Sequence, residues 1–221
     1  MMEKNRLLEK AKAFIFDLDG TLVNSMWMWP EIDREFLNNR GFEVPADLKE
    51  EIDGLSMWDD AIYFKKRFGF KDTEQELIDI WNDMALHHYE NDTPLKPGAR
   101  ELLDYLKEKG IKTGLATSNS LVLCEASLRS NGVYDYFDAI VTSEDVVHGK
   151  PDPQCYQIAA ERFGTNSADC LVAEDLPAGL TAAKSAGMTA IAVEDDYSRQ
   201  YEADKKSLSD FIISDYRELI P

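Results

Sequence analysis

Two carboxylates follow directly after an apolar run near the start of the sequence. The run is AFIF, residues 13–16, and the segment DLDGT that follows it supplies Asp17 and Asp19. Like charges at the end of a buried strand repel each other, and removing them from water is costly. We therefore expect a bound cation or a basic side chain to balance these two charges.

Polar residues also follow three later apolar runs, which we interpret as strands at 111–116, 138–142 and 170–173. Ligands bind beyond the carboxyl ends of the strands in an open parallel sheet, so these residues are expected to meet Asp17 and Asp19 at one edge. They are, in chain order, Thr117, Ser118, Asn119, Lys150, Glu174 and Asp175.

The types of these residues indicate phosphoryl chemistry. Clustered carboxylates attract a hard divalent cation with oxygen ligands, for which Mg²⁺ is the best candidate. Lys150 and the Thr117 hydroxyl suit a phosphoryl group, which carries charge on three oxygens. One carboxylate can attack phosphorus to form an aspartyl phosphate, while the second moves a proton to and from the ester oxygen. Asp19 stands among other acids, so we expect its pKa to be raised toward that use.

The elements that must position these residues predict an α/β fold. From residue 94 onward, short apolar runs alternate with helical segments, a pattern typical of a parallel sheet with helices on both faces. The segment before it shows helical periodicity and no convincing strand pattern. We expect a Rossmann-like core with an inserted all-helical cap domain, the core formed by residues 1–23 and 94–221 and the cap by residues 24–93.

Composition excludes several classes of function. The chain has 221 residues and a formal net charge of −18, which argues against binding to nucleic acid or to an anionic membrane. No apolar run is long enough for a signal peptide or a membrane span. Three widely spaced cysteines without a CxxC pair favour a reducing compartment, so we expect a cytoplasmic protein that is a monomer or a small homo-oligomer.

The polar strand ends resemble, in order, the four motifs of the haloacid dehalogenase-like hydrolase superfamily. The matching segments are DLDGT, Thr117 after a strand, Lys150 in GKPDP, and Glu174-Asp175 followed by PAG. The resemblance covers essentially the whole chain. It includes a helical cap inserted after the first motif, as in the branch that contains the beta-phosphoglucomutases and the phosphoglycolate phosphatases.

This resemblance implies a role for each residue. Asp17 would be the nucleophile and a metal ligand, and Asp19 would be the general acid and base, with its backbone carbonyl on the metal. Asp175, together with Glu174, would complete the Mg²⁺ site. The phosphoryl group of a small phosphorylated substrate would be bound by Thr117, Ser118, Asn119 and Lys150.

The cap departs from the mutase pattern. The beta-phosphoglucomutases have a histidine twelve residues after the nucleophile and a cap arginine that binds the second phosphate. Trp29 and Met57 stand at the corresponding positions here, which weakens a mutase interpretation. Trp29 and Trp58 are either part of the substrate pocket or part of the cap core.

Three functions therefore stay in competition. The leading hypothesis is a Mg²⁺-dependent phosphatase that hydrolyses a small phosphorylated metabolite, such as a sugar phosphate, through an aspartyl phosphate. A phosphosugar mutase of the beta-phosphoglucomutase type is the first alternative. A non-enzymatic, receiver-like phosphoacceptor domain is the second, and the paired aspartates and the helical insertion argue against it. The sequence does not identify the substrate.

Overall fold

Six parallel strands form a sheet in the computed structural model, which describes residues 4–52 and 55–221. The strand order is β3-β2-β1-β4-β5-β6, and every neighbouring pair is parallel. This arrangement confirms the predicted α/β class. The strands are β1 (Ala13–Phe16), β2 (Lys112–Ala116), β3 (Ala139–Val141), β4 (Cys170–Glu174), β5 (Thr189–Val193) and β6 (Phe211–Ile213).

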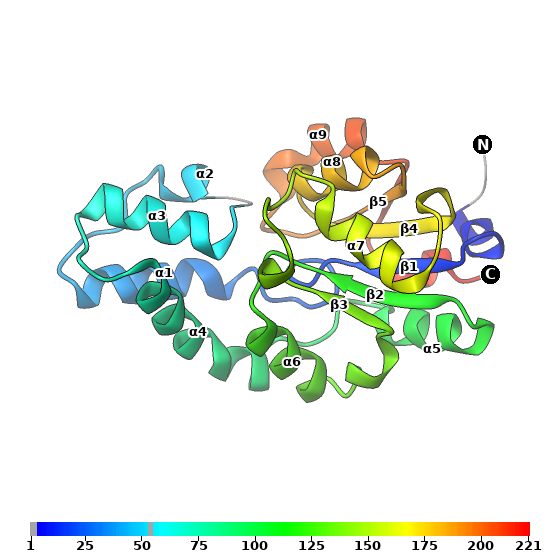
Figure 1. Cartoon of the computed structure of the whole chain (residues 1–221), viewed down its shortest axis with the longest axis horizontal. Coiled ribbons are helices and arrows are strands. Elements are labelled where there is room, and N and C mark those ends of the chain that lie inside the picture. Colours follow the sequence, from blue (N-terminus) through cyan, green and yellow to red (C-terminus); the bar gives the residue numbers. More distant parts are fainter. Residues whose placement is uncertain (1–3, 53–54) are drawn as a thin grey trace.

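Helices cover both faces of this sheet (Figure 1). Phe14 and Phe16 of β1 point to one face, and Ala13 and Ile15 point to the other, since successive side chains of a strand alternate. The phenylalanine face is covered by α5 (Ala99–Lys109) and α6 (Leu121–Ser130). The opposite face, which is rich in alanine, is covered by α7 (Gln154–Phe163), α8 (Pro177–Ser185) and α9 (Glu202–Leu208).

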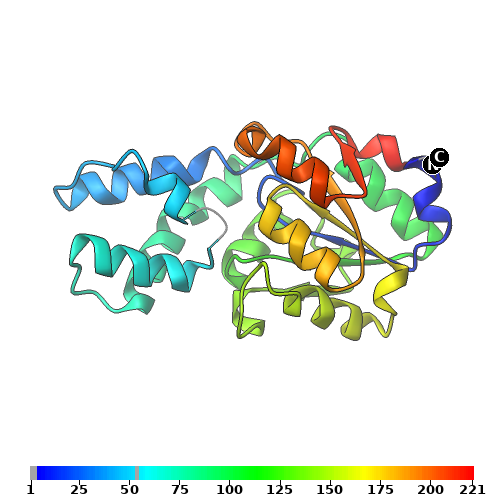
Figure 2. The same cartoon turned by 90° about the horizontal axis from the view of Figure 1, so that it is seen from above.

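The segment between β1 and α5 folds into helices. These are α1 (Met28–Asn39), α2 (Leu48–Ile52), α3 (Met57–Phe68) and α4 (Glu74–Asn91). Figures 1 and 2 both show α1, α2 and α3 grouped beyond one end of the sheet. Edge-to-face contacts among Phe36, Phe64 and Trp81 join α1, α3 and α4 into one apolar cluster.

The starts of these helices follow from local side-chain capping. Ser56 caps α3 by accepting a hydrogen bond from the Asp59 amide, and Thr73 and Glu76 form a capping box at the start of α4. Helix α1 begins at Met28 rather than at Pro30, because proline is tolerated throughout the first turn. The sequence patterns missed the short helices α2 and α9.

The two connections between the core and the inserted helices run side by side. The Lys96 amide donates to the Leu22 carbonyl and the Asn24 amide donates to the Pro94 carbonyl, each at 2.9 Å. Val23 and Leu95 form an antiparallel bridge between them. We propose that this paired crossing is the boundary between the core, residues 1–23 and 94–221, and the cap, residues 24–93.

On α4, His88 is partly buried, and its Nδ1 lies 3.0 Å from the Asp92 carboxylate. Among the described residues, no helix is long and apolar enough to cross a membrane.

Packing of α7 onto the sheet generates a stability prediction. A Cβ at Gly114 in β2 would lie 2.5 Å from Cζ of Phe163, the last residue of α7. Gly114→Ala should therefore lower the free energy of unfolding by about 1–2 kcal/mol, because the ring must move. In a Phe163→Leu background the same change should cost less, since leucine is shorter. Urea unfolding of the four proteins in this double-mutant cycle measures the coupling, and equal costs in both backgrounds would contradict the contact.

Candidate active site

A buried lysine lies between two of the predicted carboxylates. Lys150 Nζ donates to Asp17 Oδ1 at 2.7 Å, to Glu174 Oε1 at 2.5 Å and to the Ala116 carbonyl at 3.1 Å. Desolvation alone would lower the pKa of Lys150, but its two carboxylate partners raise that pKa well above the ordinary value. The sequence predicts a positive charge beside Asp17, and Lys150 supplies one.

The pKa of Asp17 stays raised despite its contact with Lys150. Burial raises its pKa to about 7, while Lys150 opposes the shift and the nearby charges of Glu174 and Asp19 add to it. A carboxylate that is still so costly to ionise calls for a further positive charge.

Three carboxylates lie close enough together to hold a metal ion. Asp17, Glu174 and Asp175 each offer an oxygen, and these oxygens lie within 4.8 Å of one another. Asp175 Oδ1 accepts a hydrogen bond from the Thr21 hydroxyl at 3.3 Å, but its buried Oδ2 has no hydrogen-bond partner among the described residues. A buried oxygen of this kind is costly unless something in the site binds it. The donor set therefore fits a divalent cation, which prefers oxygen ligands.

Glu174 is held differently from Asp175. Its Oε1 accepts hydrogen bonds from Lys150 and, at 2.8 Å, from the Tyr156 hydroxyl. Its Oε2 accepts from the backbone amides of Asp175 and Leu176, at 3.0 and 3.3 Å, where α8 begins. Both oxygens already have partners, so Asp175 is better placed than Glu174 to offer an oxygen to a metal.

Two glycines make this cluster possible. Gly20 has φ +72°, and a Cβ there would lie 2.5 Å from Asp175 Oδ2. A Cβ at Gly179, in the first turn of α8, would lie 1.8 Å from Glu174 Oε1. Only residues without a side chain fit against these carboxylates at both positions.

Asp19 lies where the core meets the inserted helices. Its Oδ1 accepts hydrogen bonds from the Ser25 hydroxyl and from the Tyr89 hydroxyl of α4, each at 2.5 Å. Its Oδ2 accepts one from the side-chain amide of Asn119 at 3.0 Å. Burial raises the pKa of Asp19, and these hydrogen bonds to the ionised form oppose the shift. The sequence missed Ser25 and Tyr89, because neither belongs to a strand end.

The remaining predicted residues also line one cavity. Thr117 Oγ1 accepts a hydrogen bond from the backbone amide of Asn119 at 3.1 Å, and this bond shapes the turn after β2. The cavity has a volume of about 160 Å³ and receives all eight residues predicted from the strand ends: Asp17, Asp19, Thr117, Ser118, Asn119, Lys150, Glu174 and Asp175.

The inserted helices form the opposite wall of this cavity. Trp29 of α1 lines it, as do Met57, Asp60 and Phe64 of α3, which are spaced at i, i+3 and i+7 on one helix face. Trp58, next to Met57, is 50% exposed and does not line the cavity. The structure therefore does not bring Trp58, a predicted pocket candidate, to the site.

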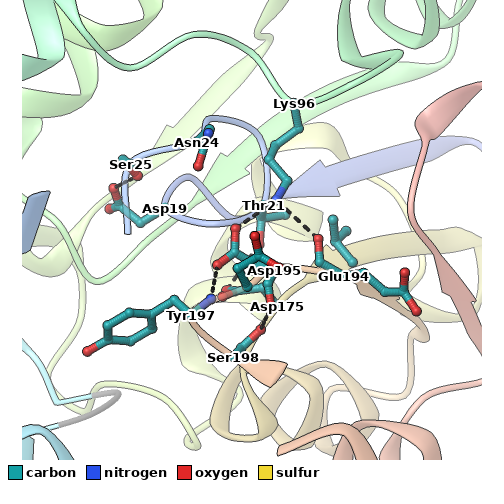
Figure 3. Close-up of polar contacts among 12 residues, drawn as sticks. Asp19, Thr21, Asn24, Ser25, Lys96, Asp175, Glu194, Asp195, Tyr197 and Ser198 are labelled. Atoms are coloured by element: carbon teal, nitrogen blue, oxygen red, sulfur yellow. Dashed lines mark hydrogen bonds and ion pairs between the residues drawn. The ribbon is translucent and has the colours of Figure 1, made fainter. Parts of the chain in front are cut away.

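A second charged network lies behind Asp175 (Figure 3). Lys96 Nζ forms a buried ion pair with Asp195 Oδ2 at 2.7 Å and donates to the Glu194 carbonyl at 3.1 Å. Lys205 Nζ donates to the Ser198 hydroxyl at 2.8 Å. Burial first, and then the charges of Glu174, Asp17 and Asp195, raise the pKa of Asp175 well above its ordinary value, and Lys205 opposes them.

Comparisons with known proteins show the family and the fold of the chain. The sequence profile of the family described as haloacid dehalogenase-like hydrolase matches residues 14–193. Hexitol phosphatase B of Escherichia coli (strain K12) is 30% identical over 184 residues, 82% of each chain. Beta-phosphoglucomutase of Bacillus subtilis (strain 168) is 34% identical over 196 residues, 82% of this chain and 83% of the other. The crystal structure of CbbY from Rhodobacter sphaeroides in complex with phosphate shares the fold, with a TM-score of 0.85 at 24% identity over 95% of this chain and 96% of that one.

Metal binding should stabilise the fold. Adding Mg²⁺ should raise the unfolding temperature, because the cation relieves repulsion among three buried carboxylates, with a gain of about 2.7 kcal/mol at one hundred times Kd. Asp175→Asn should remove most of this response. Asp196→Asn, whose wild-type side chain is 92% exposed, is the control and should keep the response. A thermal-shift titration measures all three proteins, and an unchanged response in Asp175→Asn would exclude this site.

Asp33, which also lines the cavity, should make stability depend on pH. Burial raises its pKa from 3.8 to about 7, so the folded state binds its proton more tightly than the unfolded state does. Its contribution to stability is therefore lost as pH rises from about 4 to 7, with an upper limit of roughly 4 kcal/mol. Asp33→Asn should be more stable than the native protein at pH 8 and similar to it at pH 4. Urea unfolding at both pH values, with exposed Glu35→Gln as control, measures this, and an equal difference at both would contradict it.

Proposed function

Because the chain belongs to the haloacid dehalogenase-like hydrolase family, we propose that it is a phosphatase that hydrolyses a small phosphorylated metabolite, such as a sugar phosphate, through an aspartyl phosphate. The observation that carries this proposal is that one cavity holds Asp17, Lys150 and the Asp175 Oδ2 atom, which has no hydrogen-bond partner in the described part of the chain. The similarity to hexitol phosphatase B supports the same substrate class.

We assign one group of this chain to each step. An Asp17 oxygen attacks phosphorus, and the P–O bond to the substrate breaks as Asp19 gives its proton to the departing oxygen. Asp19 then takes a proton from the water that attacks the phosphoryl group, so Asp17 is released together with inorganic phosphate. The raised pKa of Asp19 favours the protonated form that the first step needs.

The surrounding residues bind and orient. Lys150 and the segment Thr117, Ser118 and Asn119 would hold the phosphoryl oxygens, since ammonium, hydroxyl and amide groups are donors to them. Asp17 and Asp175, with Glu174 and the backbone carbonyl of Asp19, would hold Mg²⁺. When bound, the cation supplies positive charge that offsets the charge of the phosphoryl group.

A phosphosugar mutase is the second candidate, because the chain is 34% identical to a beta-phosphoglucomutase. Such an enzyme must bind two phosphates in turn. The cap positions where the resemblance places binding groups carry Trp29 and Met57, and both line the cavity. Neither side chain carries a positive charge that could bind a second phosphate. Their presence therefore favours the phosphatase function over the mutase function. Membership of a hydrolase family argues against the receiver-like alternative.

Phosphorus NMR with a panel of sugar and hexitol phosphates and Mg²⁺ tests the proposal. Inorganic phosphate should accumulate, and EDTA should stop it. Asp17→Asn should lower kcat on the order of 10³-fold or more, and Asp19→Asn by roughly 10²–10⁴-fold. Asp83→Asn, on the exposed face of α4, should match the native protein. A new ester peak without free phosphate would identify a mutase instead.

A further inference from the structure

The cavity has an uneven distribution of charge. Among the described residues that line it, Lys150 is the single basic side chain, and two carboxylates of the sheet edge already bind it. The inserted helices contribute two more acids, Asp33 of α1 and Asp60 of α3. The wall opposite the phosphoryl-binding end is therefore acidic, with no cation of its own in the described lining.

Asp33 is the more informative of these two acids. It lies one helical turn after Trp29, so both residues share the face of α1 that lines the cavity. Its side chain is partly buried, and no hydrogen bond or ion pair to its carboxyl group exists within residues 4–52 and 55–221. A carboxyl group kept in such a place destabilises the fold unless a ligand uses it.

The neighbours of Asp33 describe what such a ligand looks like. Trp29, Met57, Phe64 and Trp81 supply apolar surface along the same wall. Apolar and aromatic surface suits the C–H faces of a carbon chain or ring, and a carboxyl group accepts hydrogen bonds from hydroxyls on that chain. A second phosphate or a carboxylate would instead approach Asp33 and Asp60 with like charge.

We propose that Asp33 is a specificity-determining residue that binds hydroxyl groups of the leaving group and excludes a second anionic group. The preferred substrates are then monophosphates of neutral, polyhydroxylated compounds. This inference rests on the proposed phosphatase function, and it adds to that function the charge and the hydrogen-bonding character of the leaving group.

Binding without turnover separates this inference from the proposed function. Calorimetry at pH 8, where Asp33 is largely ionised, in an Asp17→Asn background with Mg²⁺, compares glucose 6-phosphate with glucose 1,6-bisphosphate as probes. The monophosphate should bind at least about tenfold more tightly. Adding Asp33→Asn should reduce the ratio of the two affinities at least about tenfold, because asparagine lacks the charge of aspartate but has the same shape. Adding Asp33→Leu should weaken the monophosphate itself, since the acceptor for the hydroxyls is lost.

The controls fix the meaning of each result. Glu35→Gln removes an exposed charge from the same helix and should leave both affinities unchanged. Equal binding of the two probes, or a ratio that Asp33→Asn does not change, would overturn the inference. A strong preference for glucosamine 6-phosphate over glucose 6-phosphate would also overturn it, by showing that the wall selects an ammonium group. Release of phosphate from phenyl phosphate by protein with native Asp17 tests the phosphatase function separately, because that probe has neither a hydroxyl nor a second anion on its leaving group.

Discussion

The burial of four carboxylates against one lysine is the constraint on which the rest of the structure depends. Asp17, Asp19, Glu174 and Asp175 are all held out of water, or nearly so, and Lys150 contacts only two of them. Among the described residues, their other hydrogen-bond partners are neutral donors, such as a hydroxyl, an amide or the start of α8, and the charge of Lys205 adds a further favourable interaction with Asp175. These donors reduce the cost of the negative charge without cancelling it. The cluster therefore fits a cation, and Asp175 Oδ2, which has no hydrogen-bond partner among the described residues, is free to face it.

Sheet register brings this charge together. Phe16 pairs with Ala173 across β1 and β4, so the residues that follow them, Asp17 and Glu174, lie side by side at the carboxyl end of the two strands. The alanine-rich face then allows α8 to approach closely, and Gly179 lets its first turn lie against the Glu174 carboxylate. A larger side chain there would separate the helix from the site. Small residues thus serve the electrostatics of this protein as much as its packing.

The sequence predicted the core of the site because its residues sit at strand ends, where order along the chain and position in a parallel sheet are tightly linked. It could not predict Tyr89 or Ser25, whose contacts with Asp19 depend on how α4 meets the core. The cap was less predictable for a related reason. Helical spacing says which residues share a face, but not which face turns toward the cavity, so Trp58 was a candidate where Asp60 in fact lines the wall.

That limit matters for function, because the shared fold does not separate a phosphatase from a mutase. The chain is similar both to a hexitol phosphatase and to a beta-phosphoglucomutase, and each similarity covers 82% of the chain. What distinguishes the two activities is whether a second phosphate can be held beside the first. In this protein the wall that would hold it offers Trp29, Met57 and the carboxyl group of Asp33. We propose that the partly buried carboxyl group of Asp33 in this wall disfavours a second phosphate, and with it the mutase reaction.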